Sequence, residues 1–205
     1  MRIAIFASGG GSNFQSIVDA TLTGNLDAQV VLCVASKAGI GVIDRATRHN
    51  IPVFILNGSV EDNLSELLDV LAAHRVSFIA LAGFMRKIPQ ELISEYPNQI
   101  ANIHPALLPS FGGAGMYGMH VHRAVLAARE SHSGATVHLV DAEYDSGLII
   151  LQETVPVLDT DTPESLAKRV LETEHQLYPK ALQLFATGRI RIDGSHSVVI
   201  EPEHS

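Results

Sequence analysis

The scarcest reactive residue in this 205-residue chain is cysteine, which occurs once, as Cys33. A lone cysteine excludes a disulfide within the chain and fits a reducing compartment, so we expect a cytoplasmic protein. The neighbours Val30 to Val34 are apolar. Apolar surroundings raise the pKa of a thiol, and a small core residue is therefore a simpler interpretation of Cys33 than a nucleophile.

Long apolar runs and basic residues are also scarce. No run approaches the roughly 20 residues of a membrane-spanning helix, and residues 1–7 are too short for a signal peptide, so we expect a soluble protein with no membrane partner. Lys and Arg number 14 against 22 Asp and Glu, a formal net charge of −8. Nucleic-acid affinity requires cations that displace counterions, so we expect no nucleic-acid partner.

The first hundred residues alternate apolar runs with amphipathic stretches. The spacing predicts strands at 3–7, 30–34, 53–56 and 78–82 and helices at 13–21, 41–49, 63–74 and 89–96. Near-continuous apolar strands joined by helices indicate an α/β fold, with a mostly parallel central sheet and helices on both faces. Ligands of such sheets gather at the carboxyl ends of the strands.

After about residue 135 the pattern changes. Runs at 136–140 and 148–157 predict a β-hairpin, and a long helix follows from the cap at Thr162, with Pro163 in its first turn, to about Phe185. The segment 194–205 is predicted to be a polar tail. No repeat or linker is visible, so we expect one domain over 1–193.

A glycine-rich segment, Ser8 to Asn13, follows the first predicted strand. Backbone N–H groups at such a place hold phosphate. The segment is not a dinucleotide fingerprint, because a G-x-G-x-x-G register from Gly9 ends on Phe14, and it lacks the lysine of a Walker loop. A phosphate site and a plain turn with a Ser12–Gln15 capping box both explain it.

The segment from Leu81 to Arg86 also has two interpretations. It suits either a floor for a flat heterocycle or a core strand that runs into a helix.

Asn102 and His104 stand two residues apart at the end of a strand-like run, so both side chains point to one face. An amide donor and a proton-carrying imidazole are what acyl transfer needs to stabilise an oxyanion. Asp145, in the acidic segment 141–147, adds a carboxylate. The alternatives are a structural histidine before Pro105 and a solvated acidic turn.

Glu174 falls on the apolar face of the long predicted helix. A buried charge needs partners, so Glu174 accepts ligand hydroxyls or meets a cation, His175 or a backbone cap.

The ten histidines suggest a metal site at His120, His122 and His138. Residues two apart on a helix point away from each other, and no third ligand has zinc-site spacing, so we expect no metal.

These motifs in this order resemble the folate-dependent formyltransferases, and among them the glycinamide ribonucleotide transformylase family, over nearly the whole chain. The matching segments are 8–13, 36–38, 81–86, 102–109, 134–138, 145–147 and 174–179. The resemblance implies a single Rossmann-like formyltransferase domain over 1–193, with a phosphate-binding half, 1–100, and a catalytic and folate-binding half, 101–193. It also implies transfer of a formyl group from 10-formyltetrahydrofolate, the co-substrate, to the amine of glycinamide ribonucleotide in purine biosynthesis, without metal, nicotinamide or flavin.

The resemblance also implies residue roles. Asn102, His104 and Asp145 become the catalytic residues, with Asp145 raising the proton affinity of the imidazole. The residues expected to contact the ribonucleotide phosphate and ribose are Gly11, Ser12, Asn13 and Glu174. Those expected to contact the folate are Met85, Arg86, Lys87, Ile88, Asn102, Ala142 and Glu143.

Three departures from the family pattern stand out. Residues 60–64 lack the arginine that the family commonly places there to meet the folate, Ser36–Lys37 replaces a usual Ser–Asn, and residues 111–118 are longer and richer in glycine, which predicts a mobile lid. A 10-formyltetrahydrofolate deformylase, methionyl-tRNA formyltransferase, sugar-nucleotide formyltransferase and a non-catalytic folate or nucleotide sensor remain alternatives. The first two usually carry a further domain. We expect a monomer or homodimer acting on small-molecule substrates.

Overall fold

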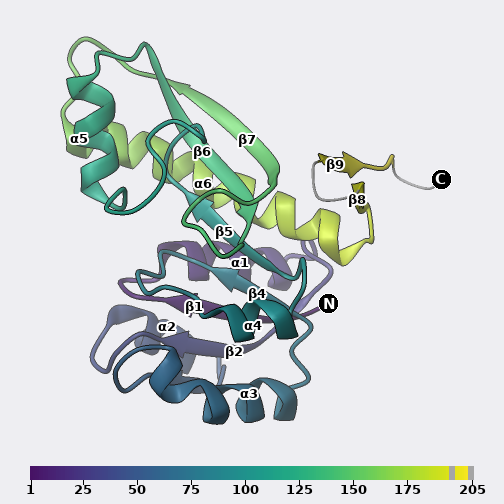
Figure 1. Cartoon of the computed structure of the whole chain (residues 1–205). Coiled ribbons are helices and arrows are strands. Elements are labelled where there is room, and N and C mark those ends of the chain that lie inside the picture. The colour runs from purple at the N-terminus through teal and green to yellow at the C-terminus, as the bar shows by residue number, and fades with distance from the viewer. Residues whose placement is uncertain (194–196, 203–205) are drawn as a thin grey trace. The chain divides into compact units, whose positions relative to one another are not determined.

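The apolar runs of the first hundred residues form a parallel sheet (Figure 1). The computed structural model describes residues 1–193 and 197–202, and the chain divides into two compact units, Met1–Asn102 and Ile103–Ser205. In the first unit the strand order is β3-β2-β1-β4-β5 and all four pairings are parallel. These strands are β1 (Arg2–Ala7), β2 (Gln29–Ala35), β3 (Val53–Ile55), β4 (Phe78–Leu81) and β5 (Ile100–His104), whose last two residues belong to the second unit.

The predicted helices connect these strands. They are α1 (Ser12–Leu22), α2 (Gly41–Arg48), α3 (Leu64–Ala73), which follows the 3-10 turn η1 (Glu61–Asn63), and α4 (Gln90–Glu95). Every residue from Ile3 to Ala7 is fully buried, as an apolar central strand requires. The predicted α/β class and mostly parallel sheet are confirmed.

The second unit is built on the antiparallel pair β6 (His132–Leu139) and β7 (Ile149–Pro156). Helix α6 (Pro163–Ala186) packs along both strands and against α5 (Met119–Ala127) (Figure 1). Strand β6 begins four residues before the predicted start at 136. A Cβ at Gly134 would collide with the Glu153 carbonyl of β7, so the residue that weakens the strand pattern is the one that permits close pairing.

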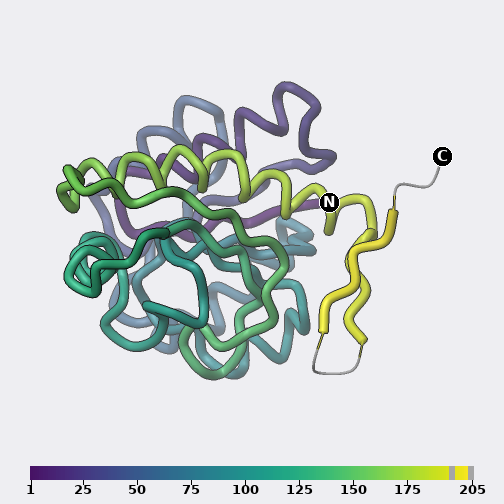
Figure 2. The backbone as a smooth tube through the Cα atoms, turned by 90° about the horizontal axis from the view of Figure 1, so that it is seen from above, coloured from purple at the N-terminus to yellow at the C-terminus, as the bar shows by residue number. Residues whose placement is uncertain are grey.

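The start of α6 is formed as predicted: Thr162 caps it and Pro163 occupies the first turn. Beyond its C-terminal end, β8 (Ile190–Asp193) pairs with β9 (Ser197–Ile200), as Figure 2 shows in yellow. The polar tail predicted for 194–205 is therefore wrong over 197–200, where a short β-branched run was overlooked. Residues 194–196 and 203–205 of that prediction lie outside the described residues.

Candidate active site

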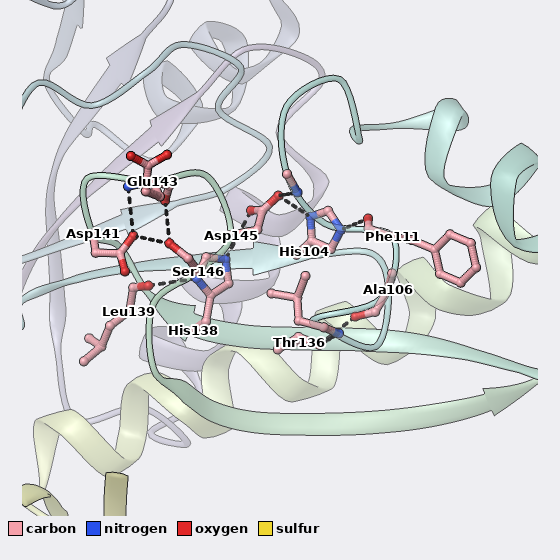
Figure 3. A network of polar contacts seen from close by, with 12 residues as sticks. His104, Ala106, Phe111, Thr136, His138, Leu139, Asp141, Glu143, Asp145 and Ser146 are labelled. Carbon is pink, nitrogen blue, oxygen red and sulfur yellow. Dashed lines mark hydrogen bonds and ion pairs between the residues drawn. The ribbon is translucent and has the colours of Figure 1, made fainter. Parts of the chain in front are cut away.

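A carboxylate between two imidazoles forms the centre of the candidate site (Figure 3). Asp145 Oδ2 lies 3.5 Å from His104 Nδ1, and Asp145 Oδ1 lies 3.5 Å from His138 Nε2. The side chains of His104, His138 and Asp145 are 4%, 2% and 11% exposed. The structure thus brings together two of the three predicted catalytic residues, His104 and Asp145, and adds His138.

The outer nitrogen of each imidazole contacts a main-chain carbonyl. His104 Nε2 lies 2.8 Å from the Phe111 oxygen, and His138 Nδ1 lies 2.8 Å from the Leu139 oxygen. A carbonyl only accepts hydrogen bonds, so each of these nitrogens must carry a proton and donate it. The inner nitrogens are the ones that face Asp145.

The chain places the three side chains at the ends of secondary-structure elements. His104 is the last residue of β5, and His138 follows a register shift near the end of β6. Asp145 lies in the loop from β6 to β7 with φ of 55°, a left-handed conformation that is uncommon outside glycine but more frequent for Asp. Its Oδ2 accepts a 2.9 Å hydrogen bond from the Gly113 N–H, which orients the carboxylate.

Burial and charge oppose each other in this cluster. Burial lowers the pKa of His104 and outweighs the Asp145 charge and the Phe111 carbonyl, which raise it. Burial raises the pKa of Asp145, but the hydrogen bond from His138, the His104 charge and the Gly113 N–H together bring it below its ordinary value. Asp145 does favour the protonated ring, as predicted, yet the net pKa of His104 lies below its ordinary value.

A hydroxyl clamp fixes the loop that follows His104. Thr136 Oγ1, fully buried on β6, donates to the Ala106 carbonyl at 2.6 Å and accepts from the Leu108 N–H at 3.1 Å. Gln152 Nε2 donates to Thr136 Oγ1 at 2.8 Å and to the Leu108 carbonyl at 3.0 Å. The path of the chain just after His104 is thereby determined by two polar side chains of the β6–β7 pair.

The other predicted residues of the second unit take separate places. Glu174 lies on α6 and is 8% exposed, so the prediction that it faces inward is confirmed. In the acidic loop, Asp141 Oδ1 accepts from the Glu143 N–H at 3.1 Å and from Ser146 Oγ at 2.7 Å, and it braces the turn. Ala142 and Glu143 are exposed, whereas the Asp145 side chain is largely buried, so the solvated-turn alternative does not describe Asp145.

In the first unit, the glycine-rich segment leads directly into α1. Gly11 is the residue before the helix, with φ of 75° and no side-chain cap, so the Ser12–Gln15 capping box, one of the two alternatives for this segment, is not formed. Gln15 Nε2 instead donates to Asp19 Oδ1 at 2.8 Å, one turn further along the helix. A Cβ on Gly11 would lie 2.7 Å from Val42 Cγ2, so only glycine fits this approach to α2. Ser12 and Asn13 occupy the first turn of α1, and the N-terminus of a helix favours anions.

The predicted folate segment, residues 85–88, begins beside the glycine-rich segment. Ser8 Oγ accepts from the Met85 N–H at 2.9 Å, and the Ser8 N–H donates to the Gly83 carbonyl at 3.2 Å. Met85 is 51% exposed, Lys87 is exposed and Ile88 is buried. Arg86 Nη2 donates to the Ser36 carbonyl at 2.6 Å, so its guanidinium is anchored to the end of β2. Asn102, which the prediction assigns to both sets, lies half-buried on β5 two residues before His104.

Other candidate chemistries find less support. Burial raises the pKa of the Cys33 thiol to about 12, so the predicted core role is confirmed. Over residues 1–193 and 197–202, no group of three His, Cys, Asp or Glu side chains is placed to hold a metal ion. In the same residues no helix has the length and apolarity to cross a membrane.

Sequence reasoning missed the groups that orient His104 and Asp145. His138 was considered only as a metal ligand, although it follows Thr136 at the alternation of a strand and so shares its face. The Phe111 carbonyl and Gly113 N–H belong to the backbone and leave no side-chain signal. They also contact His104 and Asp145, and the predicted lid motion of 111–118 stays a prediction.

This arrangement suits acyl transfer. A carboxylate beside an imidazole accepts a proton from an attacking nucleophile, and the imidazole supplies a donor to a developing oxyanion. Asn102 precedes His104 by two residues on the same strand.

Known proteins resemble the chain closely. The sequence matches the formyl transferase family over residues 1–182. A chloroplastic phosphoribosylglycinamide formyltransferase of Arabidopsis thaliana is 45% identical over 195 residues, which are 93% of this chain and 67% of that protein. The corresponding protein of Vigna unguiculata is also 45% identical, over 94% of this chain and 64% of its own length. The chain thus spans about two thirds of these plant relatives.

A solved structure resembles the fold over almost the full length. The crystal structure of glycinamide ribonucleotide transformylase 1 from Symbiobacterium toebii matches with a TM-score of 0.91 and 36% sequence identity. The match covers 98% of this chain and 94% of that one.

Proposed function

Because the chain belongs to the formyl transferase family, we propose that it transfers a formyl group from 10-formyltetrahydrofolate to the amine of N1-(5-phosphoribosyl)glycinamide. The products are N-formylglycinamide ribonucleotide and tetrahydrofolate, a step of de novo purine biosynthesis. The observation that carries the proposal is the buried His104–Asp145 pair at the end of β5, in a chain 45% identical to named phosphoribosylglycinamide formyltransferases.

The catalytic roles follow from the donors and acceptors of the cluster. The neutral amine attacks the formyl carbon, a C–N bond forms, and the carbonyl electrons move to oxygen. The Asn102 amide and the His104 ring stabilise this oxyanion, and Asp145 accepts the proton that the amine loses. In the free site burial favours the neutral ring. An oxyanion beside it is a second negative charge, which favours the protonated ring as the adduct forms.

The binding roles are proposed residue by residue. Gly11, Ser12 and Asn13 hold the ribonucleotide phosphate, which the N-terminus of α1 supports. Glu174 accepts the ribose hydroxyls, which its buried place on α6 supports. Met85 to Ile88, Asn102, Ala142 and Glu143 contact the folate, where the exposed Met85 supplies apolar surface.

We propose that residues 1–193 act as one formyltransferase domain in the cytoplasm, as a monomer or homodimer, without nucleic acid, metal, nicotinamide or flavin. The plant relatives are named chloroplastic. Formyl-folate and the ribonucleotide are its small-molecule substrates.

The test is the absorbance change of 10-formyltetrahydrofolate mixed with the purified protein, with and without glycinamide ribonucleotide. We expect loss of the formyl group only when the ribonucleotide is present, and none with His104→Ala. Equal loss without the ribonucleotide would identify a deformylase. Binding of both molecules without any turnover would identify a sensor.

A further inference from the structure

We infer that His138 is a positioning residue, which holds the Asp145 carboxylate between two imidazoles and shares the proton that the carboxylate receives. The inference rests on the proposed formyl transfer. His138 Nε2 lies 3.5 Å from Asp145 Oδ1, while the other oxygen, Oδ2, faces His104 Nδ1 at the same distance. Each carboxylate oxygen therefore has its own imidazole (Figure 3).

Counting protons shows why the second imidazole matters. The Phe111 and Leu139 carbonyls each require an N–H from the outer nitrogen of a ring. A neutral imidazole has one N–H, so with both rings neutral each inner nitrogen presents a lone pair to the ionised Asp145. One further proton changes this contact into an attraction, wherever it resides among Nδ1 of His104, Nε2 of His138 and the carboxylate. The three side chains form one proton-sharing cluster.

This proton-sharing cluster fits the stoichiometry of the reaction. The attacking amine loses one proton, which Asp145 accepts and shares with His138 Nε2, whose Nδ1–H stays on the Leu139 carbonyl. When the C–N bond to the folate nitrogen breaks, the electron pair moves to that nitrogen. The same proton then leaves the cluster and neutralises the folate nitrogen. The amine and the folate nitrogen exchange one proton, and no other reactant is needed.

The surroundings define which groups affect this proton. His104 on β5 and His138 on β6 face the carboxylate, and Asp141 and Glu143 share its loop. His122 on α5 is buried, and its pKa is lowered first by burial and then by the charge of His104. A proton on His138 Nε2 donates to Asp145 and holds the pKa of that carboxylate down, and the charge it gives to His138 holds the pKa of His104 down. Loss of His138 therefore raises both pKa values.

The experiment compares His138→Gln and His138→Asn with His132→Gln, a control in the exposed start of the same strand. The glutamine nitrogen stands near Nε2 and donates to Asp145 but takes up no further proton, whereas the asparagine nitrogen stands near Nδ1 and serves Leu139 only. We expect kcat to fall about 10-fold in the first variant and on the order of 10²-fold in the second, with KM nearly unchanged. The acidic limb of the kcat profile moves to higher pH in both.

A second readout separates this inference from the proposed function. The imidazole nitrogens of His104 are titrated by NMR without substrates, in the wild-type protein and in His138→Gln. We expect the titration of His104 to move to higher pH in the variant. An unchanged titration, or lower kcat with an unmoved acidic limb, would reduce His138 to a structural residue and overturn the inference. If the wild-type protein transfers no formyl group, the proposed function fails, but the NMR titration still decides the coupling.

Discussion

The two regions that we assign to catalysis and to phosphate binding are built in different ways. In the second unit, the His104–Asp145–His138 cluster is made of side chains held by backbone groups and by each other. In the first unit, the segment 8–13 depends on backbone conformation and on the absence of a side chain at Gly11. A substitution in the second unit easily removes a charge from the cluster, whereas a substitution in the first unit easily changes the shape of the backbone. Substitutions should therefore affect kcat in one region and KM or stability in the other.

The largest effect is expected at Asp145. Asp145→Asn keeps the shape of the side chain but removes the proton acceptor, so kcat should fall about 10²- to 10⁴-fold. The pKa of Asp145 lies below its ordinary value, so the carboxylate stays ionised and wild-type activity persists until the pH falls through that lowered pKa. Steady-state kinetics from acidic to neutral pH measures both, with the exposed Asp159→Asn as the control. Similar kcat values in the two variants would refute the catalytic role.

Gly11 is the residue at which the backbone shape of the first unit is tested most directly. In Gly11→Ala the left-handed backbone alone costs about 1–2 kcal/mol, and the new Cβ meets Val42 at 2.7 Å. We expect lower stability in urea and a KM for the ribonucleotide raised roughly 10-fold or more, with a smaller change in kcat. Gly9→Ala and Gly10→Ala are the controls, because nothing lies within 4 Å of a Cβ at either position. Equal KM values in all three variants would remove the phosphate role from Gly11.

The hydroxyl clamp should give an intermediate result. Thr136→Val leaves the Leu108 N–H and Ala106 carbonyl without this partner and should lower the free energy of unfolding by about 1–3 kcal/mol. Thr136→Ser keeps the hydroxyl and should restore most of the loss. Denaturation curves of both variants decide whether the hydroxyl, rather than the methyl group, carries the effect.

The smallest effect is expected at Ser8. Ser8→Ala removes the acceptor of the Met85 N–H in a half-exposed setting, where water replaces it. The free energy of unfolding should change by about 0.5 kcal/mol. A change in the KM for 10-formyltetrahydrofolate much larger than this would show that Ser8 orients the 85–88 segment for folate binding.

The two regions also differed in how well the sequence predicted them. Apolar periodicity predicted β1 to β4 and their helices because the strands are apolar, and β1, β2 and β4 are buried over nearly their whole length. The side chains of His104 and Asp145 were identifiable because their types carry chemistry. Strand pairing could not be read from the sequence. The early start of β6 depends on Gly134 facing a carbonyl of β7, and β9, which was not predicted, is only four residues long.

The missed parts of the His104–Asp145–His138 cluster have a similar cause. The distance between His138 and Asp145 is set by the β6–β7 loop and by a register shift after Val137. The Gly113 N–H depends on the path of a glycine-rich loop. Pattern reasoning on one sequence identifies reactive residue types, whereas partners brought close by tertiary structure need coordinates.

The carbonyl contacts of the two imidazoles also bear on mutational tolerance. Phe111 and Leu139 hold His104 and His138 through main-chain oxygens, so a new side chain at position 111 or 139 keeps the same acceptor. Point substitutions there leave the tautomers of both rings unchanged, provided that the backbone path is kept. Insertions or deletions in the segments that carry these oxygens displace them. The protonation pattern of the site is therefore robust to drift in residue identity and vulnerable to changes in loop length.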